Sequence, residues 1–82
     1  MLSTYTDHAR GRMQQRGIPS ATVEALLDYG SSAPAGDGCE VVFFDKAVRK
    51  AARFPNAYVV VGRDGAVVTV GHRYRRVPRG RR

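Results

Sequence analysis

Two histidines and a large number of arginines are the residues that could do chemistry near neutral pH. His8 lies near the start of the chain and His72 near its end, and the chain has no other histidine. RNA can be cleaved without a metal by its own 2′-OH, given a base, an acid and cations around the phosphate. Histidine suits both proton roles. His8 and His72 are therefore the catalytic candidates, provided that the fold brings them together.

The motifs of other catalytic chemistries are absent from the sequence. It has no Walker-type phosphate loop and no GxGxxG, HExxH or CxxC pattern. Its seven acidic residues are scattered, and its one cysteine, Cys39, is too few for a cysteine metal site or an internal disulfide. We interpret Cys39 as a small buried hydrophobic residue at the start of a strand. We predict no metal site and no cofactor.

Positive charge is concentrated in the second half of the chain. The net charge is +7, of which residues 1–40 contribute −2 and residues 41–82 contribute +9. A charge of this kind favours polyanionic partners. Arginines with an interleaved tyrosine can hold phosphates and stack on a base. The candidate phosphate-binding or RNA-binding residues are Arg12, Arg16, Lys46, Arg49, Lys50, Arg53, Arg73, Tyr74 and Arg75.

A first helix is predicted over residues 7–16. Thr6 or Asp7 can cap its N-terminus, and Gly17 supplies a left-handed stop. Ala9 and Met13 form a narrow apolar stripe, so the helix must dock on another element to be stable. His8, Arg12 and Arg16 follow one another at intervals of four on a neighbouring face.

A second helix is predicted to begin at Ile18-Pro19-Ser20 and to end at Gly30. Proline is tolerated in a first helical turn. Val23, Leu26 and Leu27 have the i, i+3, i+4 spacing of a core-facing stripe. The two helices should form a hairpin whose corner is anchored by Ile18.

A β-hairpin is predicted over residues 57–70, around a two-residue turn at Asp64-Gly65. Its register would pair Arg63 with Ala66, Val61 with Val68, Val59 with Val70 and Ala57 with His72. Side chains alternate along a strand, so the face with Val59 and Val70 should be the drier one and pack on the helices.

The remaining segments complete an α+β domain. Residues 31–38 (SSAPAGDG) are all turn formers and are predicted to be a mobile loop. Residues 39–44 read as an interior strand and residues 46–54 as a basic amphipathic helix. We expect one domain over residues 1–76, two N-terminal helices on an antiparallel sheet of about three strands in the order ααβαββ. Residues 77–82 would be a flexible basic tail.

Membrane insertion is not expected. No apolar run approaches the roughly 18 residues of a membrane span, and the N-terminus has no apolar segment of the kind found in signal peptides. We therefore expect a cytoplasmic protein with no membrane partner.

The segment at residues 8–18, HARGRMQQRGI, resembles the signature of a bacterial and phage family of unknown function. That signature reads His-Ala-x-x-Arg-Met-x-x-Arg-Gly-Ile, followed by a Val/Leu helix. The late strand Val67–Val70 and the FFDK segment at residues 43–46 fit the same family. The resemblance implies kinship with RelE- and BrnT-like toxins, and hence a RelE-like fold of helices on an antiparallel sheet. It would place His8, Arg12, Arg16, Thr69 and His72 at the functional face.

Three functional hypotheses follow. The first is a RelE-like, metal-independent endoribonuclease of toxin type, with RNA or the ribosome as target and an antitoxin or another acidic protein as possible partner. The second is a non-catalytic module that binds nucleic acid or a partner protein through the basic residues. The third is a structural domain, dimeric through an exposed sheet edge.

Overall fold

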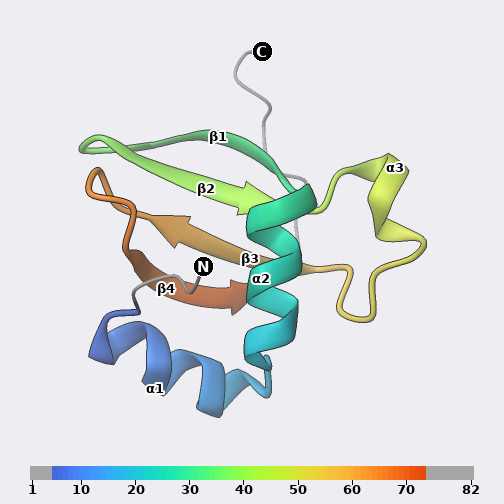
Figure 1. Cartoon of the computed structure of the whole chain (residues 1–82), viewed down its shortest axis with the longest axis horizontal. Helices are drawn as coiled ribbons and strands as arrows, with labels where there is room; N and C mark the ends of the chain where they lie inside the picture. The colour runs from blue at the N-terminus through green and yellow to red at the C-terminus, as the bar shows by residue number, and fades with distance from the viewer. Residues whose placement is uncertain (1–4, 74–82) are drawn as a thin grey trace.

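The structure is a computed structural model that describes residues 5–73 (Figure 1). Tyr74, Arg75 and the tail over residues 77–82 lie outside the described residues. Four antiparallel strands form one sheet in the order β1-β2-β3-β4, and two N-terminal helices pack against it. The predicted α+β class is confirmed. The elements are α1 (Asp7–Arg16), α2 (Ser20–Tyr29), β1 (Ser31–Gly36), β2 (Cys39–Phe43), α3 (Lys46–Arg49), β3 (Ala57–Val61) and β4 (Val67–His72).

Helix α1 begins and ends where its sequence predicts. The Thr6 hydroxyl accepts a hydrogen bond from the backbone N–H of Ala9 at 3.1 Å, and Gly17 takes the left-handed conformation with φ 66°. The Thr6 hydroxyl also donates to the carbonyl of Val68 at 3.1 Å, which ties the start of α1 to β4. The narrow apolar face of α1 is thus stabilised by docking on this strand, with Ala9 fully buried.

The core lies between the two helices and one face of the sheet. Helix α1 contacts β4, whereas α2 lies across β2 and β3 (Figure 1). Ile18 is buried at the corner between the helices, as predicted. The buried core residues are Ala9, Ile18, Val23, Leu26, Val42, Phe44, Ala57, Val59, Val67 and Val70.

The segment predicted to be a mobile loop is strand β1. It pairs with β2 in antiparallel register, Ala33 opposite Val41, with an irregularity between Pro34 and Gly36. Its residues have low β propensity, but propensity is overridden here because pairing satisfies backbone groups along one side of β2. The Ser31 hydroxyl also donates to Asp45 at 2.9 Å, which fixes the start of the strand. The sheet therefore has four strands and the order is ααββαββ.

Helix α3 is shorter than the predicted helix over residues 46–54. Asp45 caps it by accepting from the N–H groups of Ala47 and Val48, but the helix ends at Arg49. The chain then makes tighter turns, because it must reverse direction and deliver residue 57 to β3. The Arg49 guanidinium donates to the Asn56 side chain at 2.6 Å and closes this connection.

The β3–β4 hairpin keeps half of its predicted register. Val59 pairs with Val70 and Ala57 with His72, as predicted, but Val61 pairs with Val67 across an irregularity. The predicted pairings of Val61 with Val68 and of residue 63 with residue 66 are wrong. The loop is longer because the Asp64 carboxylate accepts from the N–H of Ala66 at 3.1 Å. The shift of one residue buries Val67 in place of Val68.

Cys39 begins β2, as predicted, but it is only half-buried and its thiol is free. Helices long and apolar enough to cross a membrane are absent from the part of the chain that the structure describes.

Candidate functional site

The two histidines lie at opposite ends of α1. Nε2 of His72 is 3.1 Å from the backbone carbonyl oxygen of Arg16, at the C-terminal end of that helix. His8 is exposed in its first turn. Because an α-helix rises about 1.5 Å per residue, His8 and Arg16 are separated by about 12 Å along the helix axis. The structure therefore does not bring His8 and His72 together as an acid–base pair.

His8 and Arg12 do lie together, as their spacing predicts. With Gly11 and Gln15 they line a hollow of about 360 Å³ on one flank of α1. Arg16, the third member of the predicted row, does not line this hollow. The hollow thus offers one imidazole and one guanidinium, supplied by a single helix.

Arg73 lies on the opposite side of the sheet from Arg12. Val42 and Phe44 belong to the helix-side core, so Phe43 between them points away from the helices. The Arg73 guanidinium lies over the Phe43 ring, with Cζ 5.1 Å from the ring centroid, and donates to the Phe44 carbonyl at 3.1 Å. Arginines from the two ends of the chain therefore do not share one surface, and Arg73 is engaged in holding the end of the sheet.

The predicted basic face of residues 46–53 is divided. Lys46, Lys50 and Arg53 are exposed, whereas Arg49 is half-buried and is bonded to Asn56. Of these residues, only Arg53 lines a groove that also involves α1 and α2.

This groove, of about 930 Å³, runs beside α1, around the start of α2 and up to the segment before β3. Its surface combines apolar and aromatic side chains with two arginines and one carboxylate. The side chains that matter for its chemistry are those of Tyr5, Arg10, Met13, Glu24, Arg53 and Phe54. We refer to it as the α1–α2 groove.

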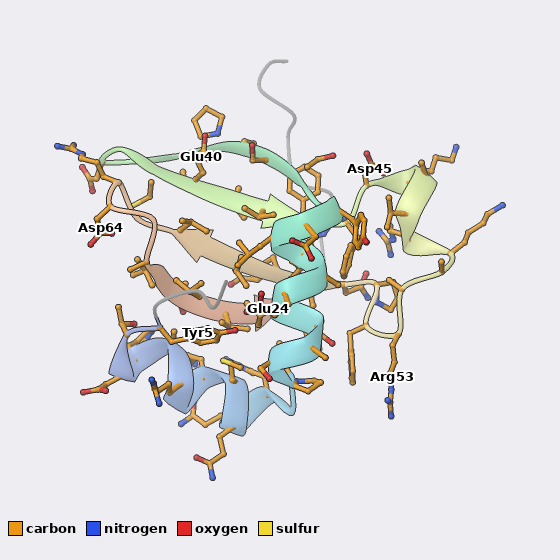
Figure 2. All side chains as sticks on the ribbon, in the orientation of Figure 1. Tyr5, Glu24, Glu40, Asp45, Arg53 and Asp64 are labelled. Atoms are coloured by element: carbon orange, nitrogen blue, oxygen red, sulfur yellow. The ribbon has the colours of Figure 1, made fainter. Side chains whose placement is uncertain are left out.

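Tyr5 and Glu24 come to the groove from different elements. Tyr5 forms a parallel bridge with Val67, and the next backbone N–H donates to the Val67 carbonyl at 3.0 Å, so β4 fixes its position. The Tyr5 hydroxyl donates to Oε2 of Glu24 on α2 at 3.3 Å (Figure 2). Burial and the neighbouring Glu24 carboxylate raise the pKa of Tyr5 above its ordinary value of 10.0. The phenol is therefore a neutral hydrogen-bond donor.

Two exposed guanidinium groups flank the groove. Arg10 lies on the flank of α1 opposite to His8, because residues two apart on a helix differ by about 200° in direction. Arg53 extends beside Phe54, with Cζ 5.7 Å from the ring centroid. Within residues 5–73, neither arginine has an ion-pair partner. The His72 ring lies beside Phe54, with the two ring centroids 6.3 Å apart.

A family model for a domain of unknown function, DUF4258, matches residues 5–76. The chain belongs to the DUF4258 family. No curated protein and no solved structure gives a significant match to this DUF4258 chain. The family assignment confirms the expected membership of an uncharacterised family.

Sequence reasoning predicted Arg53 but missed Tyr5, Arg10, Glu24 and Phe54. Glu24 had a signal, since it is an acid one residue from the core-facing Val23 within α2. Tyr5 had none, because only the bridge to Val67 shows that it faces α2 rather than solvent.

Proposed function

We propose that this DUF4258 chain is a small RNA-binding domain whose α1–α2 groove accepts single-stranded RNA. The observation that carries the proposal is the pair of guanidinium groups, Arg10 and Arg53, that flank apolar and aromatic surface without an ion-pair partner among the described residues. Arginine binds phosphate bidentately, and aromatic rings stack on exposed bases. The net charge of +7 attracts a polyanion at longer range.

Single-stranded RNA suits this groove better than a duplex does. A single strand can turn its bases outward, so one base can contact Phe54 or Tyr5 while its flanking phosphates reach the two arginines. In a duplex the bases are stacked inside and only the backbone would meet the apolar wall. The kinship with RelE-like toxins that the family resemblance of residues 8–18 implies would also make RNA the target.

The proposal is limited to binding and does not include cleavage. In-line attack on phosphorus needs the base and the acid on opposite sides of the phosphate. His8 and His72 are separated along α1, and the two titratable groups that meet in the groove, Tyr5 and Glu24, are hydrogen-bonded to each other. The proposal therefore retains RNA binding from the first hypothesis and takes the absence of catalysis from the second.

Fluorescence anisotropy with a labelled 12-nucleotide uridine RNA tests the proposal. Arg10→Gln and Arg53→Gln should each weaken binding by about 3- to 10-fold, through loss of a charge-assisted phosphate contact. Arg63→Gln is the matched control, because it removes the same charge at the exposed β3–β4 turn, next to Asp64 and far from Arg53 in Figure 2.

Equal effects of all three substitutions would show that only overall charge matters and would overturn the groove as the RNA site. Absence of binding by the wild-type protein at low salt would overturn the proposed function. Incubation of the same RNA in EDTA should leave it intact, and fragments with 2′,3′-cyclic phosphate ends would instead favour the endoribonuclease.

A further inference from the structure

Glu24 presents a carboxylate inside a groove that we assign to a polyanion. A carboxylate repels phosphate, so at this place it weakens binding unless it faces a hydrogen-bond donor of the RNA. Neither Arg10 nor Arg53 neutralises it through an ion pair within the described chain. Its one hydrogen bond there comes from Tyr5, on Oε2.

The geometry points to Glu24 as a reader of guanine, a substrate preference that rests on the proposed RNA-binding function. An ionised carboxylate only accepts hydrogen bonds and has two oxygens side by side. Guanine presents two adjacent donors on its Watson–Crick edge, N1–H and the N2 amino group. Adenine and cytosine each present one donor beside an acceptor, and uracil presents one donor between two acceptors. Guanine is thus the RNA base that a carboxylate pairs with best.

Tyr5 holds the Glu24 carboxylate in place. Its hydroxyl bonds Oε2 from the side of β4, and Glu24 itself is half-buried on a helix whose inner face packs in the core. A carboxylate restrained in this way loses less conformational entropy when a base binds. Because Tyr5 donates to Oε2, which still has acceptor capacity, both oxygens can accept from the base.

The rest of the groove matches the other parts of a guanosine nucleotide. Met13 and Phe54 supply apolar and aromatic surface for the purine ring. Arg10 of α1 and Arg53 of the segment before β3 both line the groove, so each can meet a phosphate of the bound strand. One base in the groove would therefore pair with Glu24, while the arginines bind phosphates of the RNA backbone.

Competition binding with uridine heptamers that carry one central test base measures this preference. Guanosine at the centre should bind about 10-fold more tightly than uridine or adenosine, the order of discrimination that a bidentate contact gives. Inosine, which lacks the N2 amino group but keeps N1–H, should fall between them. Equal affinities for all four heptamers would overturn the inference and leave the RNA-binding function standing, whereas absence of any binding would overturn both.

Glu24→Gln should remove the preference for guanosine, because the amide offers one acceptor beside a donor in place of two acceptors. Glu40→Gln removes the same charge from an exposed position on β2 and should keep the guanosine preference. Tyr5→Phe should reduce the preference without abolishing binding. Retention of the full preference in Glu24→Gln, with wild-type thermal stability, would contradict the role of Glu24.

Discussion

Nε2 of His72 and the backbone carbonyl oxygen of Arg16 lie 3.1 Å apart, so the end of β4 meets the C-terminal end of α1. This contact joins positions that are far apart in sequence and completes the docking of α1 begun by Thr6 at the other end of the helix. It also assigns His72 to the packing of the domain, together with its ring contact to Phe54. Among residues 5–73, His8 has no comparable contact.

The two histidine variants should therefore differ in stability. His72→Ala loses the contact with the Arg16 carbonyl and part of the packing on Phe54, and should lower the free energy of unfolding by about 1–2 kcal/mol. His8→Ala is expected to remain within about 0.5 kcal/mol of wild type, as at other exposed sites. Urea denaturation followed by circular dichroism measures both. Equal stabilities of the two variants would show that the His72 contact contributes nothing.

Thr6, which precedes α1, should contribute strongly to the stability of the protein. Thr6→Ala removes both the cap of α1 and the bond to the Val68 carbonyl, and should cost about 1–2 kcal/mol of unfolding free energy. Thr6→Ser keeps the hydroxyl and is expected to retain most of that stability. The urea midpoints of the two variants decide the matter, and coincident midpoints would argue that the hydroxyl bonds do not contribute.

Two glycines should respond in opposite ways to alanine. A Cβ on Gly30 would lie 2.5 Å from the Leu26 carbonyl oxygen and 2.7 Å from a Val42 methyl, so Gly30→Ala should destabilise the protein by about 1–3 kcal/mol. Gly11 lies within α1, and beyond the helix's own backbone no atom of residues 5–73 lies within 4 Å of such a Cβ, so Gly11→Ala should stabilise the protein by about 1 kcal/mol. Thermal melts measure the sign of each stability change. A Gly30→Ala protein as stable as wild type would mean that α2 and β2 do not approach so closely.

Ionisation of Tyr5 should lower the stability of the protein as pH rises in the alkaline range. Its pKa is raised in the folded protein by burial and then by Glu24, so the native state holds the phenol proton more tightly than the unfolded state. Its contribution is fully present below the unfolded pKa of 10.0 and is lost as pH rises through the higher folded value. Tyr5→Phe has no titrating phenol and therefore lacks this contribution to the free energy of unfolding. The stability difference between wild type and variant should therefore shrink or reverse above about pH 10. Urea melts at intervals between pH 8 and pH 11 test this, and a constant difference would contradict it.

The local signals in the sequence predict the helices and the centre of the sheet. Thr6, Gly17 and Ile18 act through neighbours in sequence, and α1, α2 and their corner follow from them. Val59 and Val70 likewise give the register near the middle of the β3–β4 hairpin. These features depend on caps, turns and periodicity, which a single sequence displays.

The features that were missed depend on tertiary contacts. Strand β1 forms because β2 offers backbone groups to residues with weak β propensity. The exchange of Val67 for Val68 in the core is an exception with a local origin, since it accompanies the bond from the Ala66 N–H to Asp64 in the turn. The candidate site, like β1, was missed because it is assembled by tertiary contacts. Residue types alone favoured His8 and His72, whereas the α1–α2 groove is assembled from Tyr5, α1, α2 and the segment before β3.

The salt dependence of RNA binding tests the central claim most directly. For a single strand, each phosphate contact contributes about −0.7 to the slope of log K against log salt concentration. The Arg10→Gln/Arg53→Gln double variant should therefore have a slope about 1.4 units shallower than wild type, whereas Arg63→Gln should keep the wild-type slope. A double variant with the wild-type slope and affinity would contradict the assignment of the α1–α2 groove to RNA.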